Sequence, residues 1–102
     1  MHQKTPYRKG YIVELRCKEL LKEFGAAHVI RSSRSLTPAD LVAIFPDRGE
    51  IWLVQVKAGR EAPRDISKLK KEFKELAKLK GTYQVKTLVF MKKEGRYCFF
   101  EI

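Results

Sequence analysis

The stretch that decides the fold is "DLVAIFPDRGEIWLVQVK", residues 40–57. It contains two apolar runs, DLVAIF (40–45) and IWLVQVK (51–57), separated by a PDRG segment whose proline, aspartate and glycine are typical of a turn. The second run is apolar at successive positions, which indicates a strand covered on both faces. We therefore predict two neighbouring strands joined by a tight turn, with the second strand in the interior of a sheet.

The residues before this stretch predict a helix and a further strand. Thr5 followed by Pro6 resembles a helix start and Gly25 provides a stop, so we expect a helix over about residues 6–24. AHVIR (27–31) is typical of a short strand. The residues expected on the buried face of the helix are Val13, Cys17, Leu20, Leu21 and Phe24.

The residues after this stretch predict a second helix and two more strands. DISKLKKEFKELAKLKG (65–81) has apolar residues at helical spacing, and its final glycine provides a stop. QVKTLVFM (84–91) and RYCFFEI (96–102) are expected to be strands joined by a KKEG turn. Since the helix connects the third strand to the fourth, the crossover allows these two strands to be parallel. The expected fold is α/β, a mixed sheet of about five strands flanked by helices, in a single domain spanning residues 1–102.

The charge balance indicates a polyanionic partner. The chain has 22 Lys and Arg against 12 Asp and Glu, a net charge of +10 over 102 residues. Such a balance favours nucleic acid over an anionic membrane. No apolar run in the sequence approaches the roughly 18 residues of a membrane-spanning helix, and MHQKTPYRKG lacks the hydrophobic segment of a signal peptide. We therefore expect a cytoplasmic protein without membrane attachment.

The two cysteines, Cys17 and Cys98, lie far apart in the sequence. They lack the CxxC spacing of a zinc site or a redox motif. We expect both to be reduced and to pack as small hydrophobic side chains.

Three polar residues mark one end of the predicted sheet. Gln55 and Lys57 lie two positions apart on one strand, so their side chains share a face. Pairing across the PDRG turn places Asp40, at the start of the preceding strand, beside them. This set suits metal-assisted phosphodiester cleavage, because oxygen ligands hold Mg²⁺ and an ammonium group orients water or offsets developing charge. Glu14, the one acid near the apolar side of the first helix, is a candidate fourth member.

Each of these residues also has a purely structural explanation. Asp40 could cap a turn after Pro38, and Gln55 could be a hydrogen-bonded amide of the core. Lys57 could be the solvated end of a strand. Their joint occurrence in this order and spacing favours the catalytic interpretation.

The pattern of Asp40, Gln55 and Lys57 resembles the PD-(D/E)xK nuclease motif, with Pro38 two positions before Asp40 and glutamine in place of the acid. Over about residues 8–102 the chain resembles more specifically the archaeal-type Holliday-junction resolvases. The segments that carry this resemblance are RKGYIVELRCKELLKEFG (8–25), VIRSSRSLTPADLVAIF (29–45) and LVQVK (53–57), with the later amphipathic helix and its two strands. The resemblance implies a restriction-endonuclease-like fold and Mg²⁺-dependent cutting of four-way DNA junctions, with Mn²⁺ as a substitute metal.

The resemblance also implies a role for each matching residue. In this family a glutamate of the first helix contributes to the metal site, and a serine-containing loop precedes the metal-binding aspartate. The residues implied here are the metal ligands Glu14, Asp40 and Gln55, the water-positioning Lys57, and Ser33 or Ser35 at the scissile phosphate.

Gln55 is the main departure from the family pattern, which has glutamate at this position. An amide oxygen can ligate a cation but brings no charge, which we estimate to weaken metal affinity by about 10- to 100-fold at equal geometry. A second hypothesis is therefore a junction- or duplex-binding protein that has the nuclease fold and weak or lost catalysis. A third is a single-strand or restriction-type endonuclease on the same core.

Basic residues that flank the predicted site in sequence are expected to hold DNA phosphates. Phosphate contacts position a duplex without reading its bases. Since the sequence has no base-reading helix or zinc finger, the expected partner is branched double-stranded DNA recognised by its shape. The many lysines of the second helix also suit a solvated face, a membrane surface or another protein. The expected DNA contacts are Arg8, Lys9, Arg31, Arg34 and Arg60.

A twofold homodimer would present two sites to the two strands that resolution of a four-way junction requires to be cut. Candidate interface residues are Tyr11, Ile12 and Leu15, together with RYCFFEI (96–102). The same side chains could instead complete the core.

Overall fold

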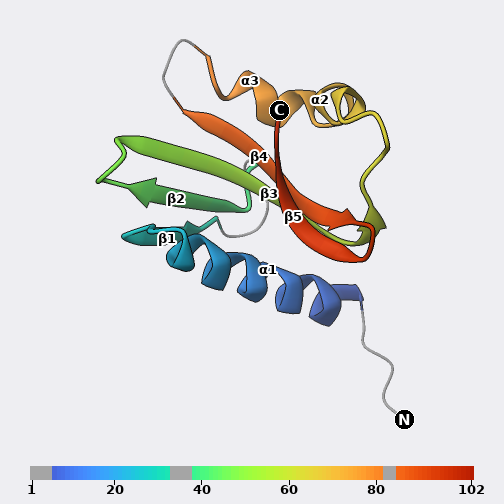
Figure 1. Ribbon diagram of the computed structural model, residues 1–102, viewed down its shortest axis with the longest axis horizontal. Helices are drawn as coiled ribbons and strands as arrows, with labels where there is room; N and C mark the ends of the chain where they lie inside the picture. The colour runs from blue at the N-terminus through green and yellow to red at the C-terminus, as the bar shows by residue number, and fades with distance from the viewer. Residues whose placement is uncertain (1–5, 33–37, 82–84) are drawn as a thin grey trace.

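The structure, a computed structural model, describes residues 6–32, 38–81 and 85–102, without the side chains of residues 6–8. Its strands form one five-stranded sheet in the order β1-β2-β3-β4-β5, with β3 at the centre (Figure 1). The predicted α/β class with a mixed sheet flanked by helices is confirmed. The elements are α1 (Pro6–Glu23), β1 (His28–Arg31), β2 (Leu41–Phe45), β3 (Glu50–Glu61), α2 (Ser67–Glu72), α3 (Lys74–Lys78), β4 (Lys86–Lys93) and β5 (Arg96–Glu101).

The strand directions follow from the lengths of the connections. A short turn joins β2 to β3, which pair antiparallel from Leu41 opposite Val54 to Phe45 opposite Glu50. The longer connection through α2 and α3 makes β3 and β4 parallel, as the crossover predicts. β4 and β5 form an antiparallel hairpin whose turn residues, Glu94 and Gly95, both have positive φ, as a tight two-residue hairpin turn requires.

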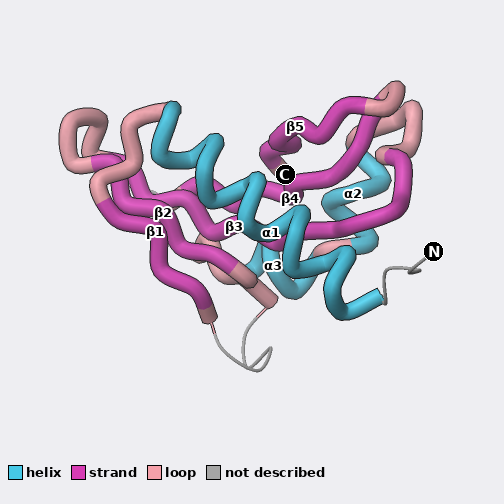
Figure 2. The backbone as a smooth tube through the Cα atoms, turned by 90° about the horizontal axis from the view of Figure 1, so that it is seen from below, coloured by secondary structure: helices cyan, strands magenta, loops and turns pink. Residues whose placement is uncertain are grey.

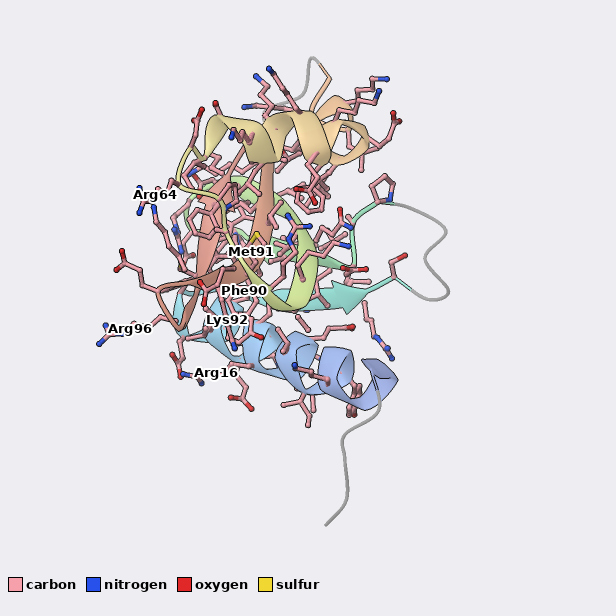
Figure 3. The ribbon with its side chains drawn as sticks, turned by 90° about the vertical axis from the view of Figure 1, so that its right-hand side faces the viewer. Arg16, Arg64, Phe90, Met91, Lys92 and Arg96 are labelled. Atoms are coloured by element: carbon pink, nitrogen blue, oxygen red, sulfur yellow. The ribbon has the colours of Figure 1, made fainter. Side chains whose placement is uncertain are left out.

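The helices cover both faces of the sheet. Figure 2 shows α1 crossing one face, and Figure 1 shows α2 and α3 on the opposite face. Consecutive residues of a strand point to opposite faces of the sheet. Phe90 packs in the hydrophobic cluster beneath α1, whereas Met91 packs in the hydrophobic cluster beneath α2 and α3 (Figure 3). The prediction that the IWLVQVK strand is covered on both faces is confirmed, since Val54 and Leu53 belong to these two clusters respectively.

The second helix differs from its prediction. The expected continuous helix over residues 65–80 is two short helices, α2 and α3, separated at Phe73, whose φ of −105° and ψ of 40° leave the helical region. No proline or glycine stands at this point, so local sequence does not end the helix. The side chains of Leu69, Phe73 and Leu76 are all buried against the sheet, and tertiary packing therefore overrides local helix propensity here.

The first helix buries only part of its predicted apolar face. Val13, Cys17 and Leu21 are in the core, but Phe24 is 49% exposed. Phe24 follows the last residue of α1. Its ring packs near the ring of Trp52, at the margin of the core and not at its centre. The proposed helix cap at Thr5 lies outside the described residues. Both cysteines are unpaired, as predicted, with Cys17 buried and Cys98 half-buried.

The β3 strand is longer than predicted and is irregular near its end. Val56 pairs with Phe90 and Glu61 pairs with Lys92, so four residues of β3, 57–60, stand opposite one residue of β4. Gly59 adopts a φ of +73° in this bulge, and its backbone N–H donates to the hydroxyl of Tyr97. The bulge begins at Lys57 and therefore sets the direction of the lysine that the sequence assigns to the site.

Candidate functional site

Asp40 lies immediately before β2 and is held against β3 by two hydrogen bonds. Its backbone N–H donates to the carbonyl of Val54 at 2.8 Å, and its carboxylate accepts the backbone N–H of Val56 at 2.7 Å. These two contacts lie on either side of Gln55 along β3. The fold therefore places Asp40 beside Gln55, as pairing across the PDRG turn predicts.

Gln55 and Lys57 lie on the face of β3 that α2 and α3 cover. Val54 packs toward α1, and alternate residues of a strand point to opposite faces. In agreement, the Nζ atom of Lys57 lies 5.7 Å from the ring centroid of Phe73, which is buried beneath α2 and α3. Both Gln55 and Lys57 are half-buried, so each side chain remains accessible from one side.

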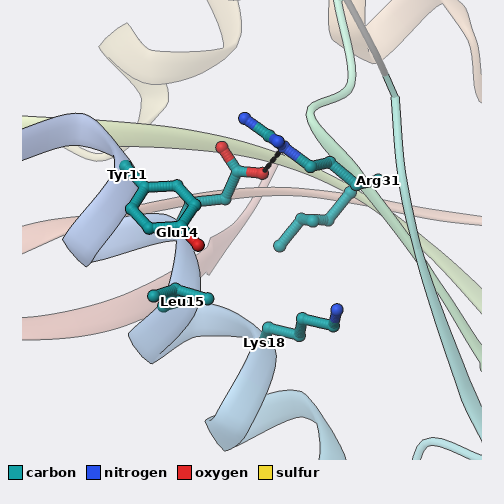
Figure 4. Close-up of a pocket in the computed structure, with 6 residues that line it drawn as sticks. Tyr11, Glu14, Leu15, Lys18 and Arg31 are labelled. Atoms are coloured by element: carbon teal, nitrogen blue, oxygen red, sulfur yellow. Dashed lines mark ion pairs between the residues drawn. The ribbon is translucent and has the colours of Figure 1, made fainter. Parts of the chain in front are cut away.

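Glu14 lies on α1, on the other face of the sheet from Gln55 and Lys57. Its carboxylate Oε1 lies 2.6 Å from Nε of Arg31, the last residue of β1. The two residues line a pocket of about 140 Å³ between α1 and the sheet, together with Tyr11, Leu15, Lys18 and Leu41 (Figure 4). The residues of the predicted site thus lie on both faces of the sheet: Glu14 on the face of α1, and Gln55 and Lys57 on the face of α2 and α3.

Burial and neighbouring charges shift the pKa values of Asp40 and Cys17. Burial raises the pKa of the Asp40 carboxyl, although the Val56 N–H and the positive charges of Lys57 and Arg31 act to lower it. Burial, and then the negative charges of Glu14 and Asp40, raise the pKa of the Cys17 thiol. Both carboxylates therefore lie within electrostatic reach of one α1 side chain, and two cations lie within reach of Asp40.

The donor set has the chemistry of a site for a hard divalent cation. Asp40 and Glu14 provide carboxylate oxygens and Gln55 an amide oxygen, which are ligands that Mg²⁺ accepts. In the part of the chain that the structure describes, no three His, Cys, Asp or Glu side chains come together as a metal-binding group. Binding of a cation by all three ligands also requires Glu14 to leave Arg31.

The basic residues assigned to DNA occupy different surroundings. Lys9 extends from α1 toward the β3 bulge, where its Nζ would lie 3.1 Å from a Cβ added to Gly59. Arg60, at the end of the same bulge, forms a two-pronged ion pair with Glu72, so its charge is already compensated within the molecule. Three of the predicted residues, Ser33, Arg34 and Ser35, lie outside the described residues, as does the side chain of Arg8.

Two residues beside Glu14 had no predicted part in the site. Tyr11 lines the pocket, and the guanidinium carbon of Arg31 lies 5.9 Å from its ring centroid. Lys18 lies four residues after Glu14, a helical spacing that could have identified it as a neighbour. No local sequence pattern predicts the contact between Glu14 and Arg31, because the two residues are distant in sequence and only the fold brings them together.

Comparisons with protein-family models, with curated proteins and with solved structures find no match to this chain. Among the described residues, no helix is both long enough and apolar enough to cross a membrane. What the chain does therefore has to be inferred from the residues around Asp40 and from its charge.

Proposed function

We propose that the chain is a metal-dependent, structure-selective DNA endonuclease that resolves four-way junctions. The observation that carries this proposal is the position of Asp40, whose carboxylate is held by the Val56 N–H beside Gln55 and within reach of the Lys57 charge. An acid, an amide and a lysine thus occupy neighbouring positions of β3 and of the residue before β2, which supports the proposal. The net charge of +10 favours DNA as the substrate.

Each residue has a distinct task in this proposal. Asp40, Glu14 and Gln55 hold Mg²⁺, and Mn²⁺ is the substitute. The bound cation supplies a Lewis acid for the scissile phosphate and lowers the pKa of water. Lys57 orients the attacking water and offsets the negative charge that develops on the phosphate. The half-buried position of Lys57 above Phe73 limits its motion, which favours a positioning role over a freely solvated one.

The test is cleavage of a labelled four-way junction in the presence and absence of Mg²⁺ or Mn²⁺. We expect Asp40→Ala and Lys57→Ala to bind the junction almost as well as the wild type and to lose Mg²⁺-dependent cutting. Lys86→Ala is the matched control, because Lys86 lies at the opposite end of the β3–β4 pair, opposite Trp52, and should leave cutting unchanged. Undiminished cleavage by both Asp40→Ala and Lys57→Ala would overturn the site. Nicked, forked and linear substrates separate junction resolution from a restriction-type or single-strand activity.

A second candidate function is junction or duplex binding with weak or lost catalysis. Gln55 favours it, because an amide oxygen at this position brings no charge, and the described residues contain no group of three His, Cys, Asp or Glu side chains that could hold a metal ion. The Gln55→Glu variant discriminates between the two functions. We expect it to cut at about 10- to 100-fold lower metal concentration than the wild type. Wild-type cutting at millimolar metal would reject the binding-only function, whereas cutting by Gln55→Glu alone would favour it.

We further propose that two copies act on one junction. Tyr11, Ile12 and Leu15 are 44%, 39% and 41% exposed on α1, which leaves an apolar surface for a second copy. By contrast, Tyr97 and Phe99 pack against the core beneath α1, so β5 contributes less to such an interface than the sequence suggested.

A further inference from the structure

The ion pair between Glu14 and Arg31 occupies one of the proposed metal ligands. Arg31 ends β1, where it stands opposite Leu41, and the following residue, Ser32, donates its backbone N–H to the carbonyl of Asp40 at 2.9 Å. Because of this hydrogen bond, the backbone of Arg31 lies close to the backbone of Asp40. From there the guanidinium extends to Glu14, 2.6 Å away (Figure 4).

The positive charge of the Arg31 guanidinium therefore acts on two carboxylates. The guanidinium contacts Glu14 directly, and its positive charge reaches Asp40, where it acts against the effect of burial. A divalent cation held by Glu14 and Asp40 would take over the charge compensation that Arg31 gives to both carboxylates. The two cations exclude each other there because both need the Glu14 oxygens and because like charges repel at short range.

The two partners of the ion pair differ in their exposure to solvent. The Glu14 side chain is 19% exposed and is fixed between α1 and the sheet, whereas the Arg31 side chain is 51% exposed. Arg31 also lies over the ring of Tyr11, on the open side of the pocket. The charged end of a long, half-exposed arginine can be drawn toward solvent or a phosphate more readily than that of a largely buried glutamate.

We propose that Arg31 is the resident counter-cation of the site: it neutralises Glu14 in the absence of metal, leaves Glu14 when a divalent cation binds, and then offers its charge to a DNA phosphate. This inference rests on the proposed function, since it assumes that Glu14 and Asp40 hold metal. It makes Arg31 a positioning residue that sets the metal concentration at which the site fills. It also links metal binding to the appearance of a phosphate-binding cation beside the site.

The test measures binding of Mn²⁺ alone to the full chain without DNA, from the electron paramagnetic resonance signal of free Mn²⁺ or by calorimetry. We expect Arg31→Gln to bind Mn²⁺ about 5- to 20-fold more tightly than the wild type, since a competing charge is removed from a partly exposed pair. Arg31→Lys, which keeps the charge, should stay within about threefold of the wild type. Asp40→Ala, which leaves no oxygen ligand at this position, defines the Mn²⁺ bound elsewhere.

The matched control is Arg16→Gln. Arg16 also pairs with a glutamate, Glu19 at 3.2 Å, and its loss changes the net charge by the same amount, but this pair is exposed on the outer face of α1. Arg16→Gln should leave Mn²⁺ affinity unchanged. Circular dichroism establishes that each variant is folded, and Arg31→Met, which also removes the charge and should tighten Mn²⁺ binding to the same extent, keeps the test if Arg31→Gln does not fold.

The outcomes separate this inference from the proposed function. Tighter Mn²⁺ binding by Arg31→Gln, but not by Arg16→Gln or Arg31→Lys, supports the counter-cation. Unchanged or weaker binding by Arg31→Gln, with Asp40-dependent binding in the wild type, overturns the counter-cation and leaves the nuclease proposal standing. If no variant binds Mn²⁺ in an Asp40-dependent manner, the metal site itself is wrong, and the counter-cation with it.

Discussion

Asp40 lowers the stability of the folded protein when it is ionised, and it is also a proposed metal ligand. Burial raises the pKa of its carboxyl, and the Val56 N–H and the charges of Lys57 and Arg31 only partly oppose this effect. A carboxyl whose pKa is higher in the folded than in the unfolded chain destabilises the fold once it is ionised. An unfavourable contribution of this kind to folding stability is typical of side chains that serve a functional site.

Asp40→Asn should therefore stabilise the protein at neutral pH while it removes the proposed metal ligand. The amide oxygen can still accept the Val56 N–H, and the buried charge is gone. We expect the free energy of unfolding at about pH 7 to rise by up to about 1 kcal/mol, after allowance for screening at a half-exposed site. Because the folded pKa is raised, the wild type loses stability as pH rises from about 4 through that pKa, so the advantage of Asn should fade toward acid pH.

Urea unfolding across this pH range measures the difference, with Asp65→Asn as the control. Asp65 accepts hydrogen bonds from the side chain and the backbone N–H of Ser67, which lower the pKa of its carboxyl. Asp65→Asn should therefore show no stabilisation at neutral pH. A loss of stability in Asp40→Asn at about pH 7 would mean that the hydrogen bond and the nearby cations outweigh burial at Asp40.

The β3 bulge is the element that positions the candidate site. It begins directly after Val56, whose N–H holds Asp40, and it contains Lys57 and Gly59. Its backbone needs a positive φ at Gly59, and the Tyr97 hydroxyl holds the N–H of the same residue. The bulge therefore couples the path of β3 to the direction of the proposed catalytic lysine.

Gly59→Ala should destabilise the protein by about 1 kcal/mol, because a φ of +73° is strained for any residue with a Cβ. The Lys9 ammonium that an added Cβ would approach can move aside, so the backbone carries most of the cost. Gly10→Ala is the matched control. Gly10 lies in α1 with no atom within 4 Å of an added Cβ, so alanine should stabilise the helix by about 0.5 to 1 kcal/mol. Thermal unfolding that gave both variants the same sign would contradict the assignment of strain to the bulge.

At the scale of the whole molecule, the excess of positive charge should govern DNA binding. The lysines of α2, α3 and the segment after them are exposed, and the outward side chains in Figure 3 include Arg16, Arg64 and Arg96. Several of these charges are compensated, as Arg60 is by Glu72 and Lys78 by Glu75. We therefore expect the basic residues near the site, among them Lys9, to contribute more to DNA binding per charge than the basic residues elsewhere on the surface.

Binding to a four-way junction, measured with EDTA so that no strand is cut, should weaken steeply with salt. Neutralisation of several phosphates predicts a loss of about a thousandfold between about 50 and 200 mM salt. Lys9→Gln should reduce the slope of log K against log salt by about one. Lys22→Gln, at the other end of α1, should leave the slope unchanged. Affinity that does not depend on salt would reject phosphate contacts as the basis of binding.

Much of the architecture could be predicted because it depends on neighbours in the sequence. Apolar periodicity, the PDRG turn and the glycines after the helices predicted the α/β class, the order of the elements and the central place of the IWLVQVK strand. The same local rules placed Asp40 beside Gln55, because the short turn and the apolar pattern together set the register of the two strands. Lys57 followed from alternation along one strand.

Only the tertiary structure decided the features that depend on distant partners. The break at Phe73, the bulge at residues 57–60 and the exposure of Phe24 arise from packing against other elements, which outweighs local propensity. The sequence assigned Glu14 to a metal and Arg31 to DNA, and the fold brings the two together as an ion pair. The sequence by itself therefore determined the fold class and the chemical groups of the candidate site. The fold decided which of those groups compensate one another, because charges interact through space and not along the chain.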